Sequence, residues 1–300
     1  MAAHPSALVT GDPRASGPRR RAAVLGNPVA HSLSPVLHRA AYRALGLDDW
    51  RYETYEVDEQ GIGSFLADLG GDWAGLSLTM PLKRAVMPLL DEVSVLATEV
   101  AAVNTVTFTA DGRRIGTNTD VAGIVAALAE AGVGAVRHAA VIGAGATAGS
   151  ALAALRALGC DAPRVYARSM VRARSLLETA RRLGVNPELI PLDRVGSAMD
   201  SELMISTLPS GAGDQLVPLC LPGARTRGDL PALLDVVYAP WPTVLSRAWQ
   251  DNGGHVVGGF AMLLHQAADQ VWLMTGRPAP LTAMREAGTA ELARRGLGGA

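Results

Sequence analysis

Apolar and polar residues follow one another along this chain in patterns that predict an α/β protein. Between residues 139 and 258, short apolar runs alternate with stretches of helical spacing, which is typical of a parallel sheet covered by helices on both faces. The first 120 residues also mix strands and helices, with more irregular connections. Two further helical patterns follow residue 260 and are separated by Pro278 and Pro280. We expect two α/β domains and C-terminal helices.

The pattern assigns individual elements to residue ranges. Apolar runs predict strands at 22–26, 51–57 and 73–80, and a helical pattern covers 35–46. The Ala-Asp-Gly sequence at 110–112 predicts the turn of a β-hairpin. In the second half of the chain, the predicted strands are AAVIG, RVYAR, ELIPL, LMISTL, LLDVVY and HVVGG.

The length of 300 residues corresponds to about two domains of ~150 residues each. We expect a disordered leader over 1–20, which is rich in Pro, Gly, Ala and Ser. A substrate-binding and catalytic α/β domain is expected over 21–120, and a doubly wound, Rossmann-type domain over 121–258. Helices over 259–300 are expected to return and pack on the first domain.

Charge and cysteine content exclude several kinds of partner. The 27 Lys and Arg residues balance 28 Asp and Glu residues, whereas nucleic-acid binders and polybasic membrane anchors carry a basic excess. No uncharged apolar run reaches the ~18 residues that span a bilayer. The six His and two Cys residues show neither metal-ligand nor CxxC spacing. We expect a cytoplasmic monomer or homodimer that binds a small molecule, with no nucleic acid, membrane or metal as partner.

A glycine-rich turn between a predicted strand and a predicted helix indicates a dinucleotide site. The residues from Gly143 to Ala148 follow the pattern G-x-G-x-x-A, with Ala in place of the third glycine. Gly143 permits the tight turn, Gly145 lets the backbone approach a pyrophosphate, and Ala148 allows close packing of helix on strand. The free N–H groups of the helix start at Ala146 and Thr147 would face the phosphates. Simple packing in a Gly- and Ala-rich chain is the alternative.

The strand that follows distinguishes between the two nicotinamide cofactors. NAD sites usually end this strand with Asp or Glu, which binds the ribose hydroxyls. Here the strand ends at Arg168 and Ser169, Arg172 follows, and the first acid is Glu178. Guanidinium groups pair with a 2′-phosphate, and Ser169 can donate to it or cap the next helix. We predict NADP, with a solvated basic helix start as the alternative.

One lysine stands out among the 27 cations, because the other 26 are arginines. Lys83 lies just past a predicted strand, after Pro81, and unlike Arg a lysine can lose its proton near neutral pH. Hydrogen-bonding side chains lie at the ends of the hairpin strands and at the next helix start: Asn104, Thr105, Asn118, Thr119 and Asp120. Thr119 or Asp120 could simply cap a helix over 121–131. Together the cluster suits a small polyhydroxylated ligand.

Seven motifs, in this order along the chain, resemble the shikimate dehydrogenase family. They are GNPVAHSLSP, TMPLK, AVNT, TNTD, GAGATA, DVVYAPW and GFAMLLHQ, and the resemblance covers about residues 22–275. The family implies NADPH-dependent, reversible reduction of 3-dehydroshikimate to shikimate in aromatic amino acid and chorismate biosynthesis. It also implies an active site in the cleft between the two domains.

The resemblance implies roles for individual residues as well. Lys83 and Asp120 would be the catalytic pair, with Lys83 as the acid in reduction and the base in oxidation. Substrate binding would involve this pair together with Ser32, Ser34, Thr79, Asn104, Tyr238 and Gln266, the two serines at the carboxylate. Cofactor binding would involve Gly143, Gly145, Ala146, Thr147, Ala148, Arg168, Ser169, Arg172, Thr207, Gly259 and Met262.

Two positions depart from the family pattern, and two other functions stay open. Ser77 and Ala167 stand where the family usually has Asn, which concerns a local supporting contact and the grip on NADP, respectively. An NAD-using quinate/shikimate dehydrogenase is disfavoured by Arg168, which has no acidic neighbour, and by the paired serines. A catalytically silent ligand sensor is disfavoured by the intact Lys83 and Asp120.

Overall fold

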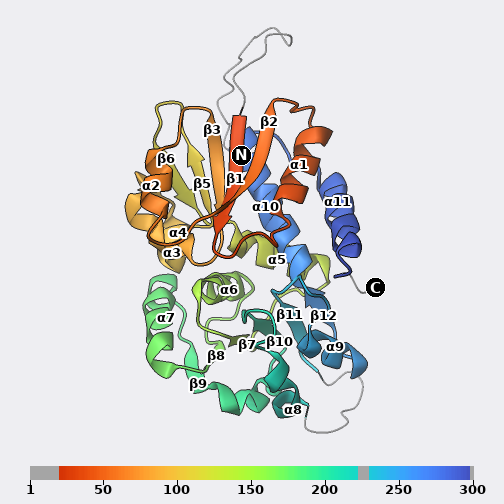
Figure 1. Cartoon of the computed structure of the whole chain (residues 1–300). Coiled ribbons are helices and arrows are strands. Elements are labelled where there is room, and N and C mark those ends of the chain that lie inside the picture. Colours follow the sequence, from red (N-terminus) through yellow and green to blue (C-terminus); the bar gives the residue numbers. More distant parts are fainter. Residues whose placement is uncertain (1–19, 222–229, 298–300) are drawn as a thin grey trace, which may run out of the picture.

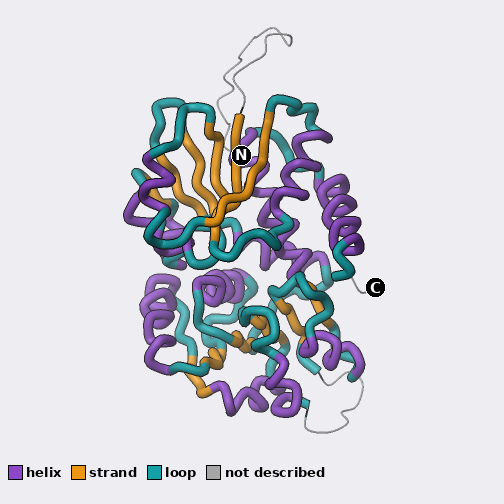
Figure 2. The backbone as a smooth tube through the Cα atoms, viewed as in Figure 1, coloured by secondary structure: helices purple, strands orange, loops and turns teal. Residues whose placement is uncertain are grey.

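The chain folds into two lobes, one above the other in Figure 1, and each lobe contains a six-stranded sheet. The computed structural model describes residues 20–221 and 230–297. The leader expected over 1–20 therefore lies outside the described residues, except for Arg20 at the start of the first strand. Helices flank the strands of both lobes (Figure 2). The two-domain α/β architecture predicted from the sequence is confirmed.

The sheet of the first lobe is mixed, with strand order β2-β1-β3-β5-β6-β4. Strand β1 pairs in parallel with β2 and β3, whereas β5 runs antiparallel to β3 and to β6. The predicted hairpin around 110–112 is thus confirmed. The strands are β1 (Arg20–Gly26), β2 (Trp50–Glu56), β3 (Trp73–Leu78), β4 (Glu92–Val93), β5 (Thr105–Phe108) and β6 (Arg114–Thr117).

The helices of the first lobe include two that come from the C-terminus. Helix α10 packs against α1, β3 and β5, and α11 packs against α1, so the chain returns to this lobe as predicted. The helices are α1 (Ser34–Ala44), α2 (Ile62–Ala67), α3 (Leu82–Ala85), η1 (Met87–Leu89), α4 (Val95–Val100), α10 (Gly259–Thr275) and α11 (Leu281–Arg294). In the described ranges, no helix has both the length and the apolar character needed to cross a membrane.

The sheet of the second lobe is parallel throughout, with strand order β12-β11-β10-β7-β8-β9. All six runs predicted as strands in this half contribute to it. The chain builds outward from β7 in one direction and then from β10 in the other, so the order changes sense between these two strands, as in a Rossmann fold. The strands are β7 (Ala139–Ile142), β8 (Arg164–Ala167), β9 (Glu188–Pro191), β10 (Leu203–Ser206), β11 (Ala232–Asp235) and β12 (Val256–Gly258).

Alternate residues of these strands enter two separate cores. Val141 and Val165 face one core, whereas Ile142 and Tyr166 face the other, because successive side chains of a strand point to opposite faces. Both faces are buried, which explains the continuous apolar runs in the sequence. The covering helices are α6 (Ala146–Ala157), α7 (Met170–Leu183), η2 (Leu192–Asp200), η3 (Asp214–Leu216), α8 (Val217–Cys220) and α9 (Val244–Asp251).

Helix α5 (Asp120–Glu130) joins the two lobes, because it packs against both α10 and α6. Thr119 precedes it without a capping hydrogen bond from its side chain. Instead, the Oδ1 of Asn118 accepts from the backbone N–H of Val121, and its Nδ2 donates to Ser150 Oγ on α6. The interpretation that the Thr119 side chain caps the helix is therefore wrong, and the Asn118 side chain caps it instead.

Candidate active site

A cavity of about 170 Å³ lies between the lobes. Residues from the first lobe, from α5 and α10, and from the start of α6 line it. Seven of the eight residues predicted to bind substrate are in its wall: Ser32, Ser34, Thr79, Lys83, Asp120, Tyr238 and Gln266. Three residues predicted at the cofactor, Thr147, Gly259 and Met262, line the same cavity. The fold thus brings the two predicted sets together at one place.

The lysine singled out by the composition forms an ion pair in this wall. Lys83 Nζ, on the short helix α3, donates to Asp120 Oδ2 over 2.6 Å. The side chains are 15% and 5% exposed, so water screens this pair less than it would a surface pair. Asp120 is the first residue of α5, where the positive end of the helix dipole favours a carboxylate. The arrangement can hold a charged amine at the cavity wall and exchange a proton with a ligand there.

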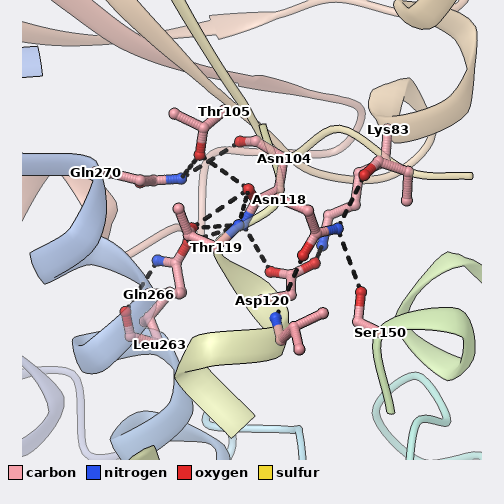
Figure 3. A network of polar contacts seen from close by, with 12 residues as sticks. Lys83, Asn104, Thr105, Asn118, Thr119, Asp120, Ser150, Leu263, Gln266 and Gln270 are labelled. Carbon is pink, nitrogen blue, oxygen red and sulfur yellow. Dashed lines mark hydrogen bonds and ion pairs between the residues drawn. The ribbon is translucent and has the colours of Figure 1, made fainter. Parts of the chain in front are cut away.

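Asn104 supports this pair from behind and is not in the cavity wall. Its Nδ2 donates to Asp120 Oδ1 at 2.8 Å and to Thr119 Oγ1 at 2.9 Å (Figure 3). Its Oδ1 accepts from the Thr119 backbone N–H at 2.8 Å. Gln266 Oε1 lies 3.3 Å from the same Nδ2. A direct bond from Asn104 to a substrate hydroxyl stays a prediction.

The loop between β1 and α1 supplies the two serines. Ser32 Oγ accepts from the backbone N–H of Ser34, which begins α1. The Tyr238 hydroxyl contacts the Ser32 side chain, and burial raises the pKa of Tyr238, so the phenol stays protonated. Arg295 at the end of α11 donates to the His31 carbonyl at 2.8 Å and pairs with Glu291. These contacts hold the loop against the cavity.

The glycine turn after β7 has the geometry that a dinucleotide requires. Gly143 has φ of +107°, and a Cβ there would lie 2.5 Å from Thr207 Oγ1, so only glycine fits. Gly145 is exposed and has open space where a side chain would project. It precedes α6 without any side-chain cap, which leaves the first N–H groups of that helix available to an anion. Ala148 is fully buried against the sheet, as predicted.

The end of β8 lies beside this turn, because β7 and β8 pair in parallel. Arg168 is exposed there, and Ser169 follows it at the start of α7. Ala167 is buried and presents no polar group to a ligand. Arg172 is in α7, but its side chain lies outside what the structure describes. An accessible guanidinium, with no acid after it in the sequence before Glu178, suits a 2′-phosphate better than a free ribose.

Three polar residues of the cavity wall, His31, Ser77 and Gln270, were not predicted as site residues. Ser77 on β3 accepts from the Tyr52 hydroxyl at 2.6 Å and donates to Gln270 Oε1 at 2.7 Å. Ser77 stands where the family usually has Asn, and it makes supporting hydrogen bonds of its own at this position. A signal for Gln270 existed in the sequence, since it lies four residues after Gln266 and shares its face of the helix.

Comparisons with known proteins agree with this geometry. Residues 24–106 match the family model for the shikimate dehydrogenase substrate binding domain, and residues 259–287 match the shikimate 5'-dehydrogenase C-terminal domain. The chain is 34% identical to shikimate dehydrogenase (NADP(+)) of Synechococcus sp. (strain JA-3-3Ab) over 295 residues, which cover 95% of this chain and 98% of that protein. This chain belongs to the shikimate dehydrogenase family.

Solved structures of shikimate dehydrogenases have the same fold. The crystal structure from Mycobacterium tuberculosis is 39% identical, with a TM-score of 0.81 over 90% of this chain and 99% of that one. The enzyme from Thermus thermophilus, in complex with NADP(H) and shikimate, is 34% identical, with a TM-score of 0.76 over 93% and 100% of the two chains. The predicted family and fold are therefore confirmed.

Proposed function

We propose that this protein is an NADP-dependent shikimate dehydrogenase, which reversibly reduces 3-dehydroshikimate to shikimate with NADPH. One observation carries the proposal: the buried Lys83–Asp120 pair lies in a cavity that also reaches Thr147, in the glycine-rich turn. A proton donor and a dinucleotide turn that share one cavity are what carbonyl reduction by a nicotinamide requires. The sequence similarity to NADP(+)-dependent relatives supports the same function.

The chain's own residues bind and orient the substrate. Ser32 and Ser34, on the loop held by Tyr238, bind the substrate carboxylate, and Thr79 and Gln266 bind ring hydroxyls from the facing walls. A small molecule held on two sides keeps its carbonyl at a constant distance from the proton donor, which lowers the entropic part of the barrier.

Lys83 and Asp120 handle the proton. When bound, the cofactor supplies the hydride that reduces the carbonyl carbon. Lys83 Nζ stabilises the negative charge that develops on the oxygen and donates a proton to it, and in the oxidative direction it takes the proton back. Asp120 orients the amine through its 2.6 Å contact.

The residues at the second lobe fit NADP. The turn at Gly143, the uncapped start of α6 and the exposed Arg168 would hold the pyrophosphate and the 2′-phosphate. Gly259 and Met262 would border the nicotinamide at the cavity. We assign the ranges 21–120, 121–258 and 259–300 to substrate binding, cofactor binding and the returning helices, respectively.

Absorbance of the reduced nicotinamide tests the function directly. Purified protein is offered shikimate or quinate with NADP or NAD, and kcat/KM is measured for the four combinations. We expect the highest value for shikimate with NADP. A preference for quinate with NAD would identify the NAD-using alternative, and absence of any shikimate-dependent reduction would identify a silent ligand sensor.

We also propose a cytoplasmic location and a monomer or homodimer in solution. Two cysteines, Cys160 and Cys220, both buried, agree with a reducing compartment. Light scattering coupled to size-exclusion chromatography distinguishes the two assembly states.

A further inference from the structure

A second polar network, almost entirely buried, runs from the cavity wall, where Ser77 and Gln270 lie, into the first lobe. It links Tyr52, Ser77, Gln270 and Thr105, which are at most 4% exposed. These residues come from β2, β3, α10 and β5, so the network connects the sheet of the first lobe to the returning helix. Buried polar groups of this kind have defined partners, and the partners impose a direction on each hydrogen bond.

The side-chain amide of Gln270 has its orientation determined at both ends. Its Oε1 accepts from Ser77 Oγ at 2.7 Å and lies 3.2 Å from His38 Nε2. The Ser77 oxygen accepts a hydrogen bond from the Tyr52 hydroxyl, and its own hydrogen points to Gln270. Burial lowers the pKa of His38 to about 3, so the ring is neutral. Because the Gln270 oxygen is an acceptor, the tautomer with the proton on Nε2 fits this contact. The Nε2 of Gln270 must therefore face the other way.

That Nε2 sets the direction of the next hydrogen bonds. It donates to Thr105 Oγ1 at 2.9 Å, and the Thr105 hydroxyl then donates to Asn104 Oδ1 at 2.8 Å (Figure 3). With its oxygen held by this hydroxyl, the Asn104 amide turns its Nδ2 toward Asp120 Oδ1, 2.8 Å away. The reverse orientation would place a carbonyl oxygen against the carboxylate.

We propose that Gln270 and Thr105 are positioning residues, which hold Asn104 so that it orients Asp120 in the Lys83–Asp120 pair. Thr105 is fully buried and lies outside the cavity wall, so it acts on the reaction only through its hydrogen-bond partners, Asn104 and Gln270. The proposal rests on the proposed function, because it concerns the rate of proton transfer in that reaction.

Thr105→Val tests the chain of hydrogen bonds with little change in shape. Single-turnover oxidation of NADPH with 3-dehydroshikimate is followed by rapid mixing, which separates the rate constant from the fraction of active protein. We expect the rate constant to fall about fivefold, which corresponds to one lost hydrogen bond, while the amplitude of the NADPH signal stays that of wild type. In steady-state assays, KM should change less than about twofold. Thr105→Ser keeps the hydroxyl and should restore the rate.

Two comparisons make the outcome decisive. Thr107→Val changes the same strand outside the network and should leave the rate constant unchanged. In a double-mutant cycle, Gln270→Met combined with Thr105→Val should slow the reaction no more than the slower single variant, because both act through Asn104. Either single variant alone remains a test if the other does not fold.

The proposal is overturned by an unchanged rate constant in Thr105→Val, by a loss of amplitude alone, or by losses that add in the double variant. Wild-type protein without shikimate-dependent activity would reject the proposed function itself. Active wild type with an insensitive Thr105 would reject only the positioning role.

Discussion

A buried histidine should make the stability of this protein depend on pH between 7 and 5, above the pH at which most carboxylates titrate. His38 on α1 is fully buried, stacks on Tyr52 with ring centroids 4.0 Å apart, and has its pKa lowered from 6.5 to about 3 by burial. Below pH 6.5 the unfolded chain binds a proton at this position that the folded chain does not. The contribution of His38 to the free energy of unfolding is therefore most favourable above pH 6.5, and the free energy of unfolding decreases as the pH falls toward 3.

The magnitude follows from the two pKa values. Each pH unit between them changes the free energy of unfolding by about 1.4 kcal/mol, so lowering the pH from 7 to 5 should cost about 2 kcal/mol at this one residue. His38→Gln removes the titration and retains an amide N–H that can donate to Gln270. The substitution itself changes the free energy of unfolding by the same amount at both pH values, so this change cancels when the two are compared.

Urea unfolding at pH 7 and pH 5 measures this difference. Wild type should lose about 2 kcal/mol more than His38→Gln over that interval. His138→Gln, at an exposed histidine, serves as the control and should follow wild type. Equal pH dependence in wild type and His38→Gln would refute the argument that burial keeps His38 neutral.

Three further predictions concern the site itself. Lys83→Arg and Lys83→Ala should both lose most of kcat with far less change in KM, and near-normal steady-state turnover of Lys83→Arg would exclude proton transfer by the amine. Gly143→Ala should abolish measurable NADP binding in calorimetry, because a Cβ would lie 2.5 Å from Thr207 Oγ1 at a φ of +107°; wild-type affinity would show that the turn adapts. Arg295→Ala should raise the shikimate KM about fivefold, because it releases the β1–α1 loop. Arg294→Ala breaks a hydrogen bond to the same glutamate, Glu291, and should leave KM unchanged. Equal KM values in the two variants would show that the contact of Arg295 with the loop does not affect substrate binding.

Much of the second lobe could be predicted because its strands are buried on both faces. Continuous apolar runs such as Ala139–Ile142 admit few other structures, and the glycine turn after them follows a pattern with a known geometry. The short helices of the first lobe were not predicted, because six residues carry too little periodicity. One of them nevertheless had a start signal in the sequence: Ser94 Oγ caps α4 by accepting from the Ala97 N–H.

Part of the candidate site could likewise be predicted from the sequence, and part of it could not. Lys83 could be singled out because it is the only lysine, and Asp120 because it lies in a cluster of hydrogen-bonding residues, and the structure brings the two together in the cavity wall. The part played by Ser77 and Gln270 depends on contacts 193 residues apart in the chain, which no local pattern encodes. Sequence spacing could place Gln270 on the same helix face as Gln266, but only the packing of α10 on the sheet shows what that face touches.

The position of α5 explains why the Asp120 carboxylate, which we propose as catalytic, lies where the two lobes meet. This helix packs closely on α10, since a Cβ at Gly123 would lie 2.9 Å from Met262 O and from Gln266 Cβ. Its first residue, Asp120, therefore lies within reach of the returning helix on one side and of Lys83 on the other. A shift of α5 relative to either lobe would move the carboxylate with it, so the geometry of the proton donor depends on how the lobes are packed as well as on the residues that touch it.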